Sequence, residues 1–334
     1  MNTIPTIFNE KITPYTAVGG KERIASTGIS AVVLNRPGHP RRAFFHDLEK
    51  TGFDNVISIE SCAPHYDIEE LSGRFPFVRF ILPENEINLG EQINLGASEV
   101  ESPLFFVLHN DMKIIAGGTA RRMAERLIVS PDENKEHSIQ DADEIKPGFK
   151  RLCTVPLILN SNYETLPSLL TPMTHKRKIR TCFKEPYNEG DKSLYPFDGV
   201  GIYDRQRFIR TGGFDITLNN IHWQLMDFGF RAHLWGEEIA VNFHFKLSYD
   251  GEFPSENYTV EDSYKRFYLK NLAPVFRSDY AHLPLYRFPG FLCKSGEDIF
   301  SAWTEFKKVR KWVVKNKFRW KSDARAVTKT WSAN

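Results

Sequence analysis

The 334-residue chain lacks several signals that would assign it to a familiar class. Its four cysteines are scattered and form no CxxC pair, which argues against a disulfide framework or a cysteine-based zinc site and favours reduced thiols. No GxGxxG motif follows the first expected strand and no GxxxxGK[ST] motif occurs, so a dinucleotide site is disfavoured and a P-loop is absent. No apolar run approaches the roughly 20 residues of a transmembrane helix, and the polar, proline-broken start does not resemble a signal peptide. We therefore expect a cytoplasmic protein.

The net charge is also small, only +2, and gives no reason to expect a nucleic-acid partner. Its distribution is uneven, however. Residues 299–334 hold ten Lys or Arg and two acidic residues, a balance of +8 that leaves about −6 for residues 1–298. The C-terminal segment is therefore strongly basic, unlike the rest of the chain.

What the chain does contain is an alternation of apolar runs and helical patterns. Four short apolar runs have the composition of buried strands: Ile29–Leu34, Phe53–Ile59, Val78–Leu82 and Leu104–Leu108. Helical patterns at Pro40–Lys50 and Leu89–Val100 alternate with them. Strands that alternate with helices predict βαβ units, hence an α/β fold with a mostly parallel central sheet flanked by helices. We expect an irregular leader over residues 1–27, a main domain over 28–275 and an extension over 276–334.

Polar residues follow three of these strands at the point where each apolar run ends. They are Asn35 and Arg36, then Glu60, then His109, Asn110 and Asp111. Because parallel strands end at one edge of a sheet, these side chains should share one rim, where open α/β sheets bind ligands. A carboxylate after the second strand can accept hydrogen bonds from a base or ribose, and one after the fourth can hold a divalent cation. The simpler alternative is that Asp111 only caps its own turn.

The segment around the fourth strand resembles family 2 glycosyltransferases of the GT-A fold. The resemblance rests on Asn88-Leu89-Gly90, Asn94-Leu95-Gly96 and the strand that ends in His109-Asn110-Asp111. It implies that Asp111 ligates Mn²⁺ or Mg²⁺ beside the diphosphate of a UDP- or GDP-type nucleotide-sugar. His109 replaces the first aspartate of the family motif, which weakens that position. We expect Asn35, Arg36, Glu60, Asn94 and Asn110 to bind the donor.

A second block, about 100 residues later, strengthens the resemblance. It comprises the segment from Asp198 to Phe208, the Gly212-Gly213-Phe214-Asp215 loop and a helix with Asp227 and Arg231. In inverting members a Glu-Asp pair on this helix supplies the base that deprotonates the acceptor, but here the pair is replaced by Gln224 and Leu225.

Candidate catalytic and metal-binding residues follow from this second block. Asp227 is the main candidate for the base, and Asp215 and His222 are weaker ones. The alternative for Asp227 is a structural i,i+4 ion pair with Arg231. His244 is either a further metal ligand, as the family often has, or a core histidine.

The basic end has an amphipathic pattern. Ile299, Trp303, Phe306, Val309 and Val313 recur at helical spacing, with lysines and arginines between them. This predicts a C-terminal basic amphipathic helix whose segment 299–321 either contacts an anionic membrane surface or packs its stripe on the main domain. In the first case the protein would be peripheral on the inner face of the membrane.

Together these features predict a metal-dependent, hexosyltransferase-type glycosyltransferase (EC 2.4). It would act on a glycan or lipid-linked acceptor in the biosynthesis of a surface polysaccharide or lipopolysaccharide. One rival is a nucleotidyltransferase, although Asn35-Arg36-Pro37-Gly38 fits its glycine-rich loop poorly. The other is a catalytically impaired homologue that binds sugar or acts as a scaffold, which His109 and Leu225 favour.

Overall fold

Nine strands form the main sheet in the computed structural model, which describes residues 13–39, 41–61, 67–115, 120–127, 151–175, 178–252 and 257–331. Their spatial order is β1-β4-β3-β2-β5-β10-β7-β11-β6. In chain order they are β1 (Tyr15–Gly19), β2 (Ile29–Leu34), β3 (Val56–Ile59), β4 (Val78–Pro83), β5 (Leu104–His109), β6 (Lys113–Ile114), β7 (Cys153–Leu159), β10 (Gly201–Asp204) and β11 (Ile239–Ser248). Two hairpins lie outside this sheet, β8 (Leu169–His175) with β9 (Lys178–Lys184) and β12 (Val275–Arg277) with β13 (Tyr280–His282).

The four strands that the sequence predicts stand side by side and run parallel, in the order β4-β3-β2-β5. All six residues of β2 and of β5 are buried, as expected for strands covered on both faces. Leu34 at the end of β2 pairs with Ile59 on one side and with His109 on the other. The three strands therefore end at the same level, and the predicted α/β class with a parallel central sheet is confirmed.

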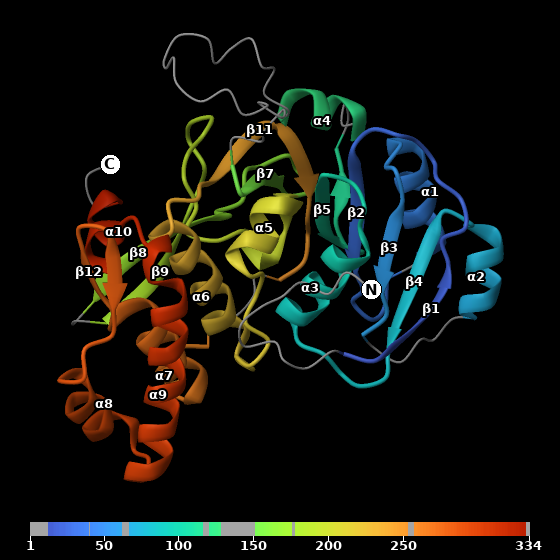
Figure 1. Ribbon diagram of the computed structural model, residues 1–334. Coiled ribbons are helices and arrows are strands. Elements are labelled where there is room, and N and C mark those ends of the chain that lie inside the picture. The colour runs from blue at the N-terminus through green and yellow to red at the C-terminus, as the bar shows by residue number, and fades with distance from the viewer. Residues whose placement is uncertain are drawn as a thin grey trace, which may run out of the picture.

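Helices cover this sheet and extend beyond it (Figure 1). They are α1 (Arg41–Thr51), α2 (Ile68–Arg74), α3 (Leu89–Glu99), α4 (Ala120–Leu127), α5 (Arg205–Thr211), α6 (Ile221–Leu234), α7 (Asp262–Phe267), α8 (Arg287–Ser295), α9 (Ile299–Asn316) and α10 (Ala324–Thr330). Asn88 caps α3 by accepting a hydrogen bond from the Glu91 amide at 3.0 Å. Gly96 on α3 lies so close to β2 that an added Cβ would approach Val32 Cγ1 to 2.3 Å. The backbone of α3 at Gly96 therefore packs directly against the side chain of Val32 in the sheet.

The predicted irregular leader contains a strand. Residues 1–12 lie outside the described ranges, but β1 pairs antiparallel with β4 at the edge of the sheet, from Tyr15 opposite Pro83 to Gly19 opposite Arg79. Tyr15 also donates a hydrogen bond to Glu99 at 2.6 Å. The expectation of an irregular leader was wrong for residues 15–19 because pairing with the exposed edge of β4 satisfies backbone groups that a loop would leave to water.

The C-terminal helices gather around α6, on the side of the molecule away from β1, β3 and β4 (Figure 1). Phe306, Val309 and Val313 of α9 are buried in the same hydrophobic core as the strands. Most of the predicted stripe thus packs inward, which is the second of the two alternatives for this helix. No helix in the described ranges is both long and apolar enough to cross a bilayer.

Close packing of α6 on the segment before β10 gives a direct test of the fold. A Cβ on Gly229 would lie 2.3 Å from the Leu194 carbonyl oxygen. Because backbone cannot move aside as a side chain can, we expect Gly229→Ala to lower the free energy of unfolding by about 1–3 kcal/mol in urea titrations. Gly73→Ala is the matched control, since nothing lies within 4 Å of its added Cβ, and its stability should be unchanged or slightly higher. Equal stability of the two variants would contradict this packing.

Candidate active site

The predicted rim residues meet at the carboxyl ends of β2, β3 and β5. The side-chain amide of Asn35 donates hydrogen bonds to Glu60 Oε1 at 3.2 Å and to the Ile59 carbonyl at 2.9 Å. The Arg36 amide donates to Asn110 Oδ1 at 2.8 Å, and Asn110 Nδ2 returns a bond to the Arg36 carbonyl at 3.1 Å. The prediction that these residues share one edge of the sheet is confirmed. Their roles in binding a donor stay predictions.

Glu60 is buried and has partners inside the protein. One carboxylate oxygen forms an ion pair with Arg41, and the other accepts from Ser58 at 2.9 Å as well as from Asn35. Glu60 is therefore already held by three donors of the protein itself. Asn35 Oδ1 is a buried acceptor for which the described residues provide no donor. Asn35 is thus the better placed of the two to accept a hydrogen bond from a nucleotide.

Asn94, also expected to bind the donor, is used elsewhere. Its Nδ2 donates to the Phe214 carbonyl at 2.8 Å and its Oδ1 accepts from the Phe214 amide at 2.9 Å. Gly213 lies close enough that an added Cβ would approach Asn94 Oδ1 to 2.4 Å. The structure argues against Asn94 as a residue that binds the nucleotide-sugar, because both polar groups of its side chain fix the Gly-Gly-Phe-Asp loop onto α3.

An ion cluster centred on Arg36 forms the electrostatic focus of the rim. Its guanidinium lies between two carboxylates, with Nη1 2.6 Å from Asp111 Oδ2 and Nη2 in an ion pair with Asp198. Nη1 also lies 3.2 Å from the Tyr249 hydroxyl. His109 Nε2 approaches both the carbonyl oxygen of Asp198, at 3.1 Å, and its Oδ2, at 3.2 Å. We call Arg36, His109, Asp111, Asp198 and Tyr249 the rim cluster.

Burial and charge oppose each other within the rim cluster. Burial alone would lower the pKa of Arg36, but the Asp198 and Asp111 carboxylates outweigh it and raise that pKa. Burial alone would raise the pKa of Asp198, but His109 and Arg36 hold it below the usual value of an aspartate. Arg36 and Asp198 are therefore both charged at neutral pH.

Asp198 and Tyr249 are members of the rim cluster that the sequence analysis did not assign. Asp198 adopts a left-handed conformation, with φ of 51°, directly before Gly199. The Asp-Gly pair was a visible turn signal, yet nothing local showed that this turn faces the end of β5. Tyr249 follows β11, whose pairing with β6 could not be read from either segment alone.

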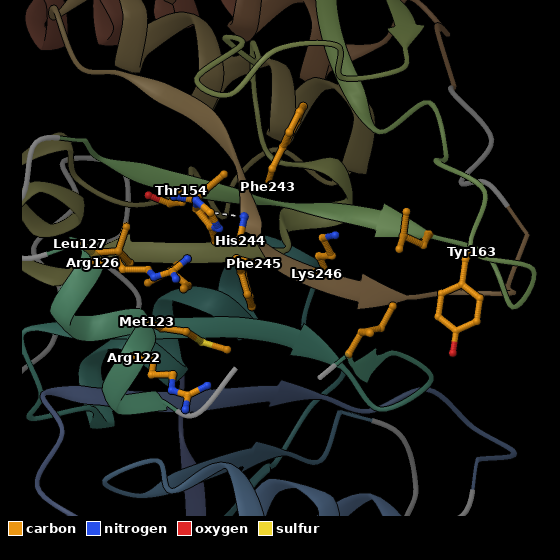
Figure 2. Close-up of a pocket in the computed structure, with 14 residues that line it drawn as sticks. Arg122, Met123, Arg126, Leu127, Thr154, Tyr163, Phe243, His244, Phe245 and Lys246 are labelled. Atoms are coloured by element: carbon orange, nitrogen blue, oxygen red, sulfur yellow. Dashed lines mark hydrogen bonds between the residues drawn. The ribbon is translucent and has the colours of Figure 1, made fainter. Parts of the chain in front are cut away.

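The three predicted metal ligands do not come together. His109 is turned to Asp198, whereas the exposed His244 lines a separate cavity of about 530 Å³ between α4 and β11, beside Lys246 (Figure 2). Pro156 has no N–H to donate, and β11 shifts its register against β7 between Asn242 and Lys246, which carries His244 outward. Within the described ranges no three His, Cys, Asp or Glu side chains are placed to hold a metal ion. The predicted set of Asp111, His109 and His244 is therefore wrong as a cluster.

Both candidate catalytic bases are buried in a second ion cluster. Asp227 is fully buried, accepts from Asn271 at 2.7 Å, and lies 3.1 Å from Arg231 and 2.8 Å from Lys270. Lys270 Nζ also lies 2.9 Å from Asp215 Oδ2. Burial would raise the pKa of Asp215, but Lys270 and the Thr217 hydrogen bond hold it below its usual value. A base must face the acceptor, and both carboxylates are buried among cations, so the base role of Asp227 and Asp215 stays a prediction that their surroundings disfavour.

His222, the third candidate, is buried beside Trp223 and Tyr258. Burial lowers its pKa to about 4, so it is neutral at physiological pH. Its surroundings are aromatic and it does not line the cavity at the rim. A packing role therefore explains His222 better than a catalytic one.

A cavity of about 790 Å³ opens beside the rim cluster. Its lining residues include Arg36 and Asp111 from the rim, Ser161 after β7, and Tyr249, Asp250 and Glu252 after β11. Asp250 and Glu252 are exposed, although Asp250 Oδ1 accepts from the Ser161 amide at 2.6 Å. The volume lies within the range of small-molecule sites, about 300–1,000 Å³. The rim cluster thus faces a space large enough for a ligand.

This architecture is similar to solved glycosyltransferase structures. GalNAc-T7 with UDP, GalNAc and Mn²⁺ matches with a TM-score of 0.50 and 13% identity over 73% of this chain and 48% of GalNAc-T7. S. aureus TarS matches with a TM-score of 0.46 and 14% identity, over 72% of this chain and 38% of TarS. TarS 1–349 with UDP-GlcNAc gives 0.47 and 13%, over 84% of this chain and 71% of the other. The chain thus spans about half the length of GalNAc-T7.

No protein-family model and no curated protein sequence matches the chain. The likeness to known proteins is therefore one of structure alone. At 13% identity, the likeness to GalNAc-T7 establishes the fold, and it confirms the predicted GT-A architecture.

The assignment of Asp227 to a structural cluster predicts a stability effect. Asp227→Ala leaves Arg231 and Lys270 short of a carboxylate in a buried site, so we expect a loss of about 3–5 kcal/mol in the free energy of unfolding. Asp262→Ala is the control: its side chain is 92% exposed and its partner Lys265 keeps Glu297 at 2.8 Å, so the change should stay under about 1 kcal/mol. An Asp227→Ala protein that is as stable as the parent but inactive would restore the catalytic interpretation.

Proposed function

We propose that the chain is a glycosyltransferase that moves a sugar from a nucleotide-sugar donor to an acceptor hydroxyl. The observation that carries this proposal is the rim of the parallel strands, where Arg36 and Asp111 line a cavity of ligand size. In open α/β sheets, ligands bind at the carboxyl ends of the strands. GalNAc-T7, which shares the fold, was crystallised with UDP and GalNAc, which supports a donor of the UDP type; a GDP-type donor is the alternative.

The chemistry required at the rim is stabilisation of a departing diphosphate. Glycosyl transfer passes through an oxocarbenium-like transition state in which negative charge grows on the leaving group. Arg36 supplies a fixed cation beside the cavity, and preorganised charge of this kind lowers the barrier most when it is desolvated. Mn²⁺ or Mg²⁺ was the predicted source of that charge. The predicted ligands do not gather in the described ranges, so Arg36 is the cation that faces the leaving group in this proposal.

The burial of Asp227 and Asp215 favours a different base for the acceptor's proton. Asp250 and Glu252 are exposed carboxylates on the cavity wall, and they replace Asp227 and Asp215 as candidates. The burial of Asp227 and Asp215 also favours the second candidate function, a sugar-binding or scaffold protein without turnover.

Release of nucleotide from nucleotide-sugars separates the two functions. We expect the protein to release UDP or GDP from at least one member of a panel of UDP- and GDP-sugars, and Asp111→Asn to slow this release by about 100-fold, since Asp111 fixes the guanidinium that meets the leaving group. Asp47→Asn, at an exposed position on α1, is the control and should retain the parent rate. Binding of a nucleotide-sugar without any release would support the scaffold instead.

The outward face of α9 bears on the nature of the acceptor. Phe300, Trp303, Lys307, Lys311 and Val314 of α9, with Phe318 in the 3-10 turn that follows it, recur at three- or four-residue spacing and are all exposed. Phe300 is 81% exposed and Phe318 66%. Lys307 Nζ lies 5.8 Å from the centre of the Trp303 ring. This outward face shares only Trp303 with the predicted stripe, whose Phe306, Val309 and Val313 are buried.

Alternating aromatic and cationic side chains suit the interface of an anionic bilayer, where aromatics enter the headgroup region and each lysine adds about 1 kcal/mol. We propose that the outward face rests on such a surface, in accord with a lipid-linked acceptor and peripheral attachment. A glycan acceptor in solution is the alternative, and it would leave these exposed aromatics without a partner. Membrane contact would bring the transferase to a polysaccharide intermediate held on a lipid.

Vesicle sedimentation tests the outward face. The protein should pellet with vesicles of phosphatidylcholine and 30% phosphatidylglycerol, on the order of 10-fold more than with phosphatidylcholine alone, because the lysines need anionic lipid. Phe300→Ser combined with Phe318→Ser should abolish pelleting. Tyr187→Ser, which removes a side chain that is 87% exposed elsewhere, is the control and should have no effect. Equal pelleting with neutral and anionic vesicles would refute the proposed surface.

A further inference from the structure

The rim cluster already contains a cation where a divalent metal ion was expected. Asp111 and Asp198 are the two carboxylates nearest the end of β5, and each side chain is only 9% exposed. The Arg36 guanidinium bridges them, with one terminal nitrogen on each carboxylate. A metal ion that used both carboxylates would have to displace this guanidinium.

Arg36 is fixed at both ends. Asn110 bonds to its backbone N–H and its carbonyl, at 2.8 and 3.1 Å, so the start of the side chain is tied to the turn after β5. At the other end Tyr249 lies 3.2 Å from Nη1, and the Tyr249 hydroxyl itself donates to the Glu252 carbonyl at 2.8 Å. A side chain that is held in this way loses little further freedom when it binds a ligand.

The guanidinium keeps donors for a ligand. Its side chain is 29% exposed and lines the cavity of about 790 Å³. Arginine has five N–H donors. Within the described ranges, Nη1 contacts Asp111 and Tyr249, Nη2 contacts Asp198, and Nε has no acceptor. The planar fork is suited to phosphate oxygens, which it can bind through two parallel hydrogen bonds.

The nearby histidine also fits an arrangement without metal. His109 stands where the resembling family has the first aspartate of its metal motif, and it directs Nε2 toward Asp198. A histidine in place of a carboxylate lowers the negative charge available to a cation. It also supplies Asp198 with a second partner besides Arg36, so the carboxylate is held without a metal ion.

We propose that Arg36 takes the place of the divalent metal ion, and that its guanidinium, positioned by Asp111 and Asp198, binds the diphosphate of the nucleotide-sugar donor directly. This inference rests on the proposed function, because it assigns the group that meets the leaving diphosphate. It makes nucleotide binding independent of metal and dependent on the fork of Arg36. Arg36→Lys would keep the charge but lose the paired geometry.

Calorimetric titration with UDP and GDP, each in EDTA and in 5 mM MnCl₂, tests this proposal. The parent protein should bind one of the two nucleotides with a Kd that differs less than 3-fold between the two conditions. Arg36→Met should weaken binding at least 30-fold and Arg36→Lys about 10-fold, with melting curves that show both variants folded. Arg42→Met, on the exposed surface of α1, is the matched control and should bind as the parent does.

Three results would overturn the inference. A parent Kd that falls 10-fold or more with Mn²⁺, an effect lost in Asp111→Asn, would show a metal site and leave the proposed function intact. Parent-like binding by folded Arg36→Met would show that Arg36 does not meet the diphosphate. Absence of UDP and GDP binding in both conditions would overturn the proposed function itself. A direct readout supports the distinction: Mn²⁺ electron paramagnetic resonance should detect no bound Mn²⁺ in the parent without nucleotide.

Discussion

The bridge that Arg36 makes between Asp111 and Asp198 joins the two halves of the molecule at the carboxyl edge of the parallel strands. Arg36 and Asp111 follow β2 and β5 of the parallel half, whereas Asp198 precedes β10 in the later block. Both carboxylates are only 9% exposed, and burying a charge without a partner is costly. The turn at Asp198 is therefore tied to the parallel half by Arg36, together with His109.

A second buried ion cluster joins separate segments of the C-terminal part. Lys270 lies between Asp215 of the Gly-Gly-Phe-Asp loop and Asp227 of α6, and Arg231 extends the cluster to the carbonyl of Gly213 at 2.7 Å. These contacts tie the loop, α6 and the segment after α7 into one unit. The segment that resembles the family motif thus has a largely structural role in this chain. Its aspartates are occupied by lysine and arginine instead of an acceptor.

The sequence predicted the parallel strands because their apolar runs are local and nearly continuous, as in Leu104–Leu108. It also predicted the shared rim, since the ends of parallel strands follow from topology alone. The predictions that the structure does not support concern contacts between residues that lie far apart in the sequence. No sequence feature near Asp227 indicated that it would contact Lys270, 43 residues later. None near Asp111 indicated that its carboxylate would pair with Arg36. His244 was misplaced because a register shift in β11, opposite Pro156, decides where that side chain points. Side-chain partners of this kind are set by packing, which periodicity does not encode.

The central claim is that the guanidinium of Arg36 meets the diphosphate of a nucleotide-sugar at the rim of the sheet. The most direct test is a crystal structure of the protein with UDP and MnCl₂ in the soak. We expect the diphosphate in the cavity beside Tyr249, with a phosphate oxygen within about 3 Å of an Arg36 nitrogen. A Mn²⁺ ion between Asp111 and the diphosphate, with Arg36 displaced, would contradict the claim, as would UDP bound away from this rim.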